Sequence, residues 1–453
     1  MRGCPPPNIF LGVFDAATDR MVVLGGDQPH IVWALSNANG LGGTPQWLPF
    51  STVADPAQGF PPSKGPSAVY DATNNRMITF GGCLANCGSP TEDVWVLTNA
   101  NGLGGSPAWL KLLPAGALPS PRANHAAVYD STSNKMIVFG GQDGCCNPQH
   151  TVGDVWVLSN ANGLGGPPIW TSLNPSGGPP PAQANTTAVY DSASNRMTVF
   201  GGSPNLSNAG TNAVWVLSNA NGAGGAPAWT NLIAEGSAGS PPVRIYATGV
   251  YDPSANRMTI FGGGAPSNIF YNDTWVLTNA NGLGAAAWTQ LLPAGGPPAA
   301  RYSAAGGLDV ASNRMIISGG SNSAGVLTDA WVLTNLNGIS YAAQVRQPVG
   351  ADGSSEFNAK RGVVPVKFTL TLNGAPTCLL PPATITLTRT SGLSPGPIDE
   401  SVFLQASDNG SNFRIDACQY IYNLATGSLG SGTYLVQIRI SGNVVGSATF
   451  GLR

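Results

Sequence analysis

Residues 122–141, Arg-Ala-Asn-His-Ala-Ala-Val-Tyr-Asp-Ser-Thr-Ser-Asn-Lys-Met-Ile-Val-Phe-Gly-Gly, hold the pattern that decides the fold of this chain. A first apolar run leads to Asp130, a short polar turn follows, and a second apolar run ends at Gly140-Gly141. Short runs of β-branched and aromatic residues bounded by Gly and Asn are typical of β-strands. The stretch therefore predicts two strands joined by a tight turn.

This pattern occurs six times along the chain. Each copy has an Asp, a Met six residues later, a Gly-Gly pair ten residues after the Asp, and then a Trp in a β-rich run such as Val94-Trp95-Val96-Leu97. In the first five copies a second Trp follows after 13 or 14 residues. These anchors are Asp15, Asp71, Asp130, Asp191, Asp252 and Asp309; Met21, Met77, Met136, Met197, Met258 and Met315; Trp33, Trp95, Trp156, Trp215, Trp275 and Trp331; and Trp47, Trp109, Trp170, Trp229 and Trp288.

Each repeat of about 60 residues contains four runs of strand length. No long segment shows the 3.6-residue period of an amphipathic helix. Four-stranded units repeated radially form a β-propeller, so the sequence predicts an all-β, six-bladed propeller over residues 1–345. We expect the Met and Trp anchors to lie in the core between blades. The Asp anchors are expected to cap their own turns.

The repeats resemble those of a kelch-type, galactose-oxidase-like propeller, whose pattern is Arg-x-x-His-Ala before strand one, Gly-Gly after strand two, an Asp-Val-Trp strand and a final Trp. The resemblance covers roughly residues 8–345. Repeats five and six keep Arg244 and Arg301 but lack the His. The residues that fit the pattern fully are Arg122, His125, Gly140, Gly141, Asp154, Trp156 and Trp170.

Loop lengths differ between the two faces that such a propeller would have. The Asp-to-Met and Trp-to-Trp spacings hardly vary, whereas the second Gly to Trp spacing runs from 7 to 15 residues. Because strands alternate in direction, loops one–two and three–four share one face, the uniform face. Loops two–three and four–one share the other, the variable face. Binding residues usually lie on variable loops, so the candidate binding face is marked by Cys145, Cys146 and His150.

Composition changes after Asn337-Gly338. Residues 346–362 are polar and charged and predict a linker, and residues 363–453 contain several short alternating runs that predict an immunoglobulin-like sandwich. Pro365-Val366-Lys367-Phe368 resembles the P-x-K-F signature of a bacterial immunoglobulin-like surface module. That resemblance implies a structural or adhesive role outside the cell.

The chain has seven cysteines. Cys378 and Cys418 are expected to form a disulfide in the sandwich. Cys83 and Cys87 close a short loop, and the adjacent Cys145 and Cys146 either pair with each other or with that loop; a zinc site is the alternative for these four. Cys4 is then the odd cysteine, left for an intermolecular bond or a free thiol.

Closure of the ring is incomplete in the sequence, because the sixth repeat lacks its second Trp. The segment 339–345 is expected to supply the missing strand within the same chain. Otherwise a strand from another subunit would fill the gap and link copies together.

No enzyme motif stands out. Copper oxidases of the kelch type need two His, two Tyr and a Tyr–Cys crosslink, but His30, His125 and His150 are not at ligand spacing. Arg122, Arg244 and Arg301 resemble a sialidase triad superficially, yet they occupy one repeat position and are expected to be scaffold. A carboxylate pair for glycan hydrolysis is invisible in sequence and stays an alternative. We expect no cofactor and no metal.

Composition excludes other classes. Only 9% of residues are charged and the formal net charge is -2, which argues against nucleic-acid binding. No run reaches the ~18 apolar residues of a membrane span, and the first twenty residues hold no signal peptide. We therefore expect a non-catalytic extracellular structural protein that self-associates, as in a filament. The alternatives are a monomeric adhesin that binds carbohydrate or protein through the variable face, and a glycan-active enzyme.

Overall fold

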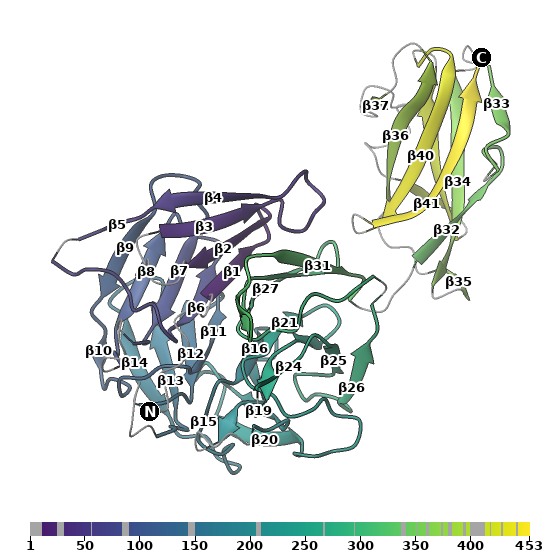
Figure 1. The fold of residues 1–453 in the computed structure, drawn as a ribbon. Helices are drawn as coiled ribbons and strands as arrows, with labels where there is room; N and C mark the ends of the chain where they lie inside the picture. Colours follow the sequence, from purple (N-terminus) through teal and green to yellow (C-terminus); the bar gives the residue numbers. More distant parts are fainter. Residues whose placement is uncertain are drawn as a thin grey trace. The chain divides into compact units, whose positions relative to one another are not determined.

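A computed structural model shows that the chain is all-β and divides between Thr334 and Asn335 into two units, a propeller and a sandwich (Figure 1). The structure describes residues 11–24, 31–55, 57–83, 90–143, 150–204, 210–265, 268–293, 295–336, 341–350, 352–358, 362–372, 375–378, 383–392, 396–398, 413–416, 418–426, 429–440 and 443–453.

The first unit is a ring of six antiparallel sheets, one for each repeat. Strand one of every blade lies next to strand one of the following blade, and β1 of the first blade also lies next to β27 of the sixth, so the ring is closed. The strands of the six blades are, in order, β1 (Leu11–Asp15), β2 (Arg20–Leu24), β3 (Ile31–Ser36) and β4 (Gln46–Ser51); β6 (Ser67–Asp71), β7 (Arg76–Phe80), β8 (Val94–Thr98) and β9 (Ala108–Leu112); β11 (Ala126–Asp130), β12 (Lys135–Phe139), β13 (Val155–Ser159) and β14 (Ile169–Leu173); β16 (Thr187–Asp191), β17 (Arg196–Phe200), β19 (Val214–Ser218) and β20 (Ala228–Ile233); β21 (Thr248–Asp252), β22 (Arg257–Phe261), β25 (Thr274–Thr278) and β26 (Ala287–Leu291); and β27 (Ala305–Asp309), β28 (Arg314–Ser318) and β31 (Ala330–Thr334).

The propeller also contains short strands of two residues outside the main strands of the blades. Two of them, β5 (Val53–Ala54) and β10 (Ala115–Gly116), pair in parallel with the outer strands β9 and β14. Two pairs form small hairpins in two–three loops, β23 (Gly264–Ala265) with β24 (Ile269–Phe270) and β29 (Ser321–Asn322) with β30 (Gly325–Val326). In the fourth blade β15 (Gln183–Ala184) of the four–one loop pairs with β18 (Ser203–Pro204) of the two–three loop.

The tight turn between strands one and two explains the fixed spacing of the repeat. In the second blade Asp71 Oδ1 accepts a hydrogen bond from the backbone N–H of Thr73, as the predicted cap of the turn. Asn75 ends the turn with φ of 51°, a left-handed conformation that Asn tolerates better than most residues. Asn or Asp occupies the same left-handed position in every blade: Asp19, Asn75, Asn134, Asn195, Asn256 and Asn313.

The propeller core lies between neighbouring blades. All six Met anchors are fully buried. The strand-four tryptophans Trp109, Trp170 and Trp229 are also buried, as predicted, whereas the strand-three tryptophans Trp33 and Trp331 are 37% and 40% exposed. The burial of the strand-three Trp thus varies between blades, because Trp95 is 1% exposed and Trp156, Trp215 and Trp275 are partly buried.

Near the axis the blades converge, and only small residues fit there. A Cβ built on Gly249 would lie 2.3 Å from Cγ2 of Thr187 in the previous blade, and one on Gly306 would lie 2.2 Å from Cγ2 of Thr248. Real Cβ atoms do not approach so closely, so a side chain at either glycine would push two blades apart.

The closure and the linker predicted from sequence are both wrong. The sixth blade has three strands in the described part of the chain, in the order β27-β28-β31. The segment expected to be its fourth strand forms β32 (Tyr341–Arg346), which pairs antiparallel with β34 of the sandwich. Residues 346–362 likewise contain β33 (Ser355–Phe357), which pairs with β41. Their alternating residues complete the sandwich sheets, so the second unit begins before residue 346.

The second unit consists of two sheets. One has the order β32-β34-β39-β38 with β35 beside β34, and the other has the order β33-β41-β40-β36-β37. The further strands are β34 (Val363–Leu372), β35 (Ala375–Thr377), β36 (Ala383–Gly392), β37 (Gly396–Ile398), β38 (Arg414–Asp416), β39 (Gln419–Ala425), β40 (Gly432–Ile440) and β41 (Asn443–Leu452). The two sheets thus form a β-sandwich; its assignment to the immunoglobulin-like surface family stays a prediction.

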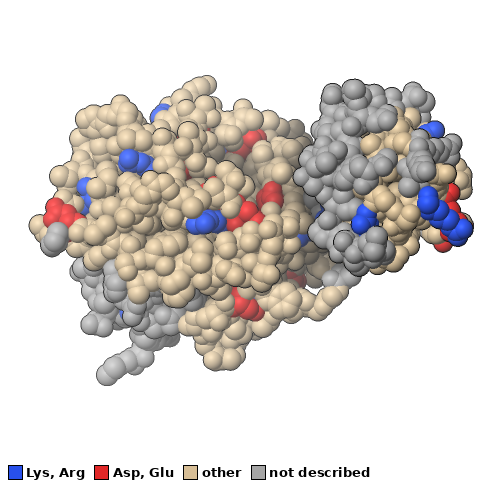
Figure 2. Space-filling view, turned by 90° about the horizontal axis from the view of Figure 1, so that it is seen from above, with Lys and Arg blue, Asp and Glu red and all other residues tan. Residues whose placement is uncertain are grey.

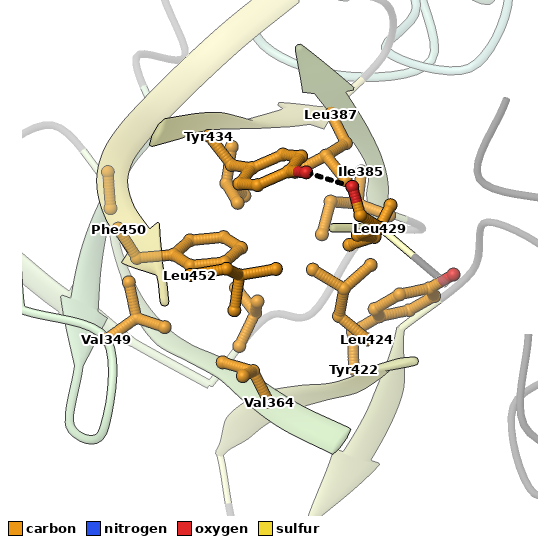
Figure 3. Packing of buried hydrophobic residues seen from close by; sticks show 13 residues of the cluster. Val349, Val364, Ile385, Leu387, Tyr422, Leu424, Leu429, Tyr434, Phe450 and Leu452 are labelled. Atoms are coloured by element: carbon orange, nitrogen blue, oxygen red, sulfur yellow. Dashed lines mark hydrogen bonds between the residues drawn. The ribbon is translucent and has the colours of Figure 1, made fainter. Parts of the chain in front are cut away.

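The sandwich core contains residues from both sheets (Figure 3). Val364 and Tyr422 of one sheet and Tyr434 and Phe450 of the other are fully buried. The Tyr434 hydroxyl donates a hydrogen bond to the Leu429 carbonyl oxygen, which satisfies a polar group inside the core.

Candidate binding site on the variable face

Of the residues predicted to mark the binding face, Cys145, Cys146 and His150, the structure describes His150. His150 is exposed and its Nδ1 lies 3.5 Å from Asp143. Cys83 is buried and disulfide-bonded. The other predicted cysteines of this unit, Cys4, Cys87, Cys145 and Cys146, lie outside the described residues, as does His30.

A chain of backbone hydrogen bonds links the blades where strand one begins, on the variable face. In four neighbouring steps, a backbone N–H donates to the carbonyl oxygen of the equivalent residue in the previous blade, at 2.8 to 3.0 Å. The residues are Gly65, Asn124, Asn185, Tyr246 and Ser303, and all five have left-handed φ values. In the second to sixth blades this turn therefore has a residue with left-handed φ.

Tyr246 is the unusual member of this series. Gly and Asn adopt a left-handed φ readily, but a bulky aromatic residue does so rarely and at a cost of order 1–3 kcal/mol. Its φ is 54°. Backbone strain of this kind is concentrated at binding and active sites, so the side chain of Tyr246 is a candidate binding residue.

Three half-buried aromatic side chains meet at this point: Tyr246, Phe270 and Tyr302, which we call the aromatic cluster. The rings of Phe270 and Tyr302 are stacked, with centroids 5.4 Å apart and an interplanar angle of 16°. The rings of Tyr246 and Tyr302 are 5.9 Å apart. The three residues come from the fifth and sixth blades, through two four–one loops and the β24 hairpin, so no single repeat contains the cluster.

Two of the three residues in the cluster carry a hydroxyl group, Tyr246 and Tyr302. Neither Tyr246 nor Tyr302 has a hydrogen-bonded partner for its hydroxyl within the described part of the protein. Burial raises the pKa of both phenols above their usual value. Both hydroxyls therefore remain protonated at physiological pH, as donors and acceptors beside an apolar ring surface.

A buried ion pair supports the cluster. Arg244 is almost completely buried and donates to both carboxylate oxygens of Asp273, at 2.7 and 3.0 Å, and its guanidinium lies 4.4 Å from the ring centre of Tyr271. Burial alone would raise the pKa of Asp273, but the hydrogen bonds and charge of Arg244 hold it below its usual value. The ion pair between Arg244 and Asp273 thus holds the loops that carry Tyr246 and Phe270 in place.

The three arginines that resemble a sialidase triad are scaffold residues. Like Arg244, Arg122 and Arg301 each form a two-pronged pair with an Asp of their own blade, Asp154 and Asp329. All three guanidinium groups are occupied in this way and do not converge on one site.

Among the described residues, the lining of the central channel contains no His, Asp, Glu, Lys or Cys side chain. A cavity of about 490 Å³ on the axis is lined by small and apolar residues of strand one, including Gly12, Ala188 and Val250, with Tyr251 its single titratable lining residue. Across the described ranges, no group of three or more His, Cys, Asp or Glu side chains is placed to hold a metal ion. The same part of the chain holds no helix that could cross a membrane.

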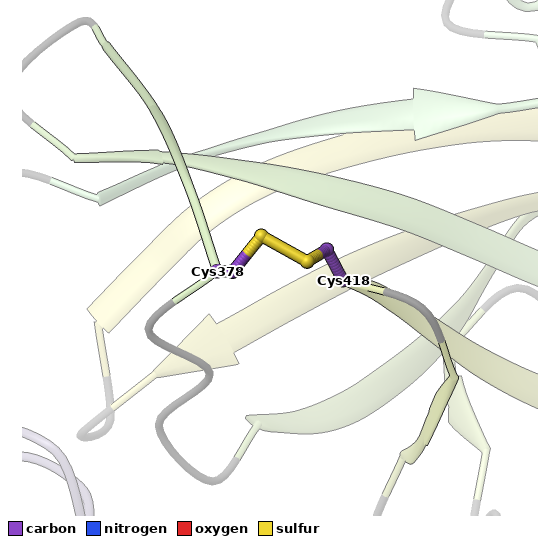
Figure 4. Close-up of a disulfide and its surroundings, with 2 residues drawn as sticks. All are labelled: Cys378 and Cys418. Carbon is purple, nitrogen blue, oxygen red and sulfur yellow. A yellow bond between two sulfur atoms is a disulfide. The ribbon is translucent and has the colours of Figure 1, made fainter.

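In the sandwich, Cys378 and Cys418 form the disulfide that the sequence predicts, with Cα atoms 4.9 Å apart (Figure 4). It joins residues that are 40 positions apart in the chain.

The propeller is similar to known kelch proteins. Residues 65–223 match the model of the KLHDC2/KLHL20/DRC7 Kelch-repeats domain. The solved structure of YjhT superposes with a TM-score of 0.51 at 15% identity, covering 74% of this chain and 98% of YjhT, which shows the fold alone. These findings support a kelch-type β-propeller.

Curated relatives share parts of the repeats. Host cell factor homolog hcf-1 of Caenorhabditis elegans is 33% identical over 152 residues, 30% of this chain and 18% of that protein. Dynein regulatory complex subunit 7 of Chlamydomonas reinhardtii is 30% identical over 130 residues, 28% of this chain and 10% of that protein. Rab9 effector protein with kelch motifs of Xenopus laevis is 25% identical over 211 residues, 43% of this chain and 48% of that protein. The chain thus spans less than a fifth of the first two relatives and about half of the third.

Sequence reasoning missed the aromatic cluster, although a signal for it exists. Tyr246 stands six residues before Asp252, at the position where the third and fourth repeats have Asn124 and Asn185. An aromatic residue at a position where other repeats have turn-forming residues breaks the repeat pattern and does not help to form the turn. Departures of this kind mark functional positions better than the repeated residues do.

Proposed function

We propose that the chain is a non-catalytic extracellular binding protein whose propeller holds a protein ligand at the aromatic cluster, while the sandwich serves as a structural module. The observation that carries the proposal is the cluster itself, with stacked Phe270 and Tyr302 beside the strained Tyr246. Rigid tyrosines with free hydroxyls are typical anchors of protein interfaces, because they combine apolar area with a polar group at low entropic cost.

Four further observations support this function. The described lining of the channel consists of small and apolar residues with one Tyr, which favours binding over catalysis. Two of the relatives, an effector of Rab9 and a subunit of a dynein regulatory complex, carry names that describe action on other proteins. Only 9% of the residues are charged, and such side chains are also sparse on the side of the molecule seen in Figure 2, so contact would depend on apolar and hydrogen-bonding groups rather than on charge. The Cys378–Cys418 disulfide favours an oxidising, extracellular compartment.

A carbohydrate ligand is the second candidate. The flat stacked pair of Phe270 and Tyr302 favours it, since a sugar ring presents an apolar face and hydroxyls to such a surface. A filament, the first expectation from sequence, stays a prediction: low charge permits close association of copies, but the aromatic cluster is better suited to recognition of a ligand.

Array binding tests this function. The wild-type chain is applied to an array of purified extracellular proteins and to a glycan array, beside a Phe270→Ala/Tyr302→Ala double variant. The matched control is Leu103→Ala/Leu164→Ala, which removes two exposed side chains from the uniform face, 41% and 38% exposed. Protein binding lost at least tenfold in the cluster variant and kept in the control supports the proposal. Binding to glycans alone would shift it to the second candidate, and binding unaffected by the cluster variant would overturn both.

A further inference from the structure

In the third, fourth and fifth blades the tryptophan of strand four has the same kind of packing partner. It packs against the previous blade, on the residue that ends strand two. The ring pairs are Phe80 with Trp170, Phe139 with Trp229, and Phe200 with Trp288, with centroids 4.8 to 5.1 Å apart. The strand-four Trp thus fills the space between two neighbouring blades, and we call this contact the seal between them.

The seal between the fifth and sixth blades is missing from the described residues. Phe261 ends strand two of the fifth blade, where a Trp from the sixth blade would pack. Instead a cavity of about 500 Å³ lies there, and its lining includes Phe261, Met315, Ile317, Val332 and Leu333. This volume is within the range of pockets that bury a ligand-sized group, and the named lining residues are apolar.

The outer edge of β31 is also uncovered. Its central residues Val332 and Leu333 are partly exposed, whereas their counterparts Val96 and Leu97 in the second blade are completely buried beneath strand four. β31 has a paired strand on one side only among the described residues. An exposed edge of this kind is a template for the addition of another strand.

The rest of this chain cannot fill the gap with a tryptophan. The residues that follow β31 enter β32, all six residues of which pair with β34 in the sandwich. All eleven tryptophans of the chain already lie in the described strands of the propeller. A second copy of the chain therefore has no spare tryptophan strand to donate.

We propose that the open edge of the sixth blade is a second binding site, which accepts an extended, tryptophan-bearing strand from a partner polypeptide. The strand would run antiparallel to β31 and insert its Trp into the cavity beside Phe261. This site contains none of the three aromatic residues of the cluster, although its cavity lining includes Asp273. The five complete blades show what fits: a short strand with Trp near its start.

The register of the added strand follows from the same comparison. In every complete blade the strand-four Trp pairs with the Leu of strand three, as in Leu158 with Trp170. The same pairing occurs in the other four blades. Leu333 is the equivalent residue of β31, so the partner Trp is expected opposite Leu333, and the residue before it opposite Thr334.

A peptide experiment tests the site. The probe is a fluorescently labelled peptide with the sequence of residues 168–175, Pro-Ile-Trp-Thr-Ser-Leu-Asn-Pro, and its binding to the whole chain is followed by anisotropy. We expect saturable binding that is at least tenfold weaker for the peptide with Trp170→Ala. Equal affinity of the two peptides, or no binding of either, would overturn the proposal.

Variants of the protein locate the bound peptide. Leu333→Arg is expected to weaken binding at least tenfold, while Leu113→Arg, at an exposed Leu of the second blade, leaves it unchanged. Because Leu333→Arg disturbs a partly buried residue, a second measurement uses disulfide capture. A peptide with Ile169→Cys is expected to crosslink to Thr334→Cys but not to Ala330→Cys, four residues away. Crosslinking to both sites equally would contradict the register.

Discussion

Asn101 in the second blade donates a hydrogen bond from Nδ2 to Oδ2 of Asp15 in the first blade, over 2.7 Å. The same bond joins Asn162 to Asp71, Asn221 to Asp130, Asn281 to Asp191 and Asn39 to Asp309. The Asp anchor therefore has two roles, because it caps its own turn and also holds the next blade. The Asn-Gly loops of the uniform face are thus structural ties between blades.

Loss of one Asn–Asp hydrogen bond between blades should lower the free energy of unfolding of the propeller. Asn162 is buried, and its replacement in Asn162→Ala leaves the Asp71 carboxylate without its buried donor, which costs about 1–3 kcal/mol. Asn74→Ala is the matched control, since exposed Asn74 donates to the same oxygen and water can replace it. Chemical denaturation of both variants checks this prediction; equal losses would contradict it.

The buried ion pair of Arg244 and Asp273 should contribute to stability only with a planar guanidinium group, which can donate two hydrogen bonds side by side. In Arg244→Lys the charge remains, but the two-pronged pair and the bond to the Gly262 carbonyl oxygen cannot all form. We expect a loss of about 2–4 kcal/mol in the free energy of unfolding. Arg453→Lys, which alters an exposed pair with Glu356, should change it by less than about 0.5 kcal/mol. A small effect at Arg244 would show that the pair is not structural.

Acid should destabilise the propeller through His125. Its ring is buried beside Phe80, with Nε2 2.7 Å from Ser67 Oγ, and burial together with the charge of Arg122 lowers its pKa to about 3. The unfolded chain binds a proton below its ordinary pKa of about 6.5, whereas the folded chain does not, so stability falls as the pH drops from 6.5 toward 3.

The slope of that loss is the measurable quantity. It is at most about 1.4 kcal/mol per pH unit for one group. Denaturation curves between pH 7 and 4.5 should show a flatter dependence for His125→Gln than for the wild type. His150→Gln, at an exposed His, should leave the slope unchanged. An unchanged slope in His125→Gln would assign the acid sensitivity to other groups.

Removal of the disulfide should affect the sandwich alone. Cys378 and Cys418 close a loop of 40 residues, and the double variant Cys378→Ser/Cys418→Ser should lose roughly 2–4 kcal/mol through the greater freedom of the unfolded chain. Calorimetry should show a lower transition for the sandwich and an unchanged one for the propeller. A shift of both transitions would mean that the two units do not unfold independently.

Much of the propeller was predictable because its repeat is local. Asp130, Met136 and Gly140 belong to one hairpin, and their spacing reflects the turn and the alternation of buried residues along two strands. The assignment of Tyr341–Arg346 failed for the opposite reason. The alternation of residues in a strand indicates which face is buried but does not indicate which strand pairs with it. From sequence, β32 could therefore pair with the sixth blade as readily as with β34, its actual partner.

The sequence by itself determined the number of blades, the order of their strands and the two faces, since these depend on short-range spacing. It also determined the Cys378–Cys418 pairing, because residues 363–453 contain these two cysteines alone. Only the tertiary structure decided the aromatic cluster and the open edge of the sixth blade. Tyr246, Phe270 and Tyr302 are brought together by two blades and three loops. The cavity at Phe261 exists because β31 has no outer neighbour in the described chain. Contacts between distant segments follow from the closed geometry of the ring, which no single repeat contains.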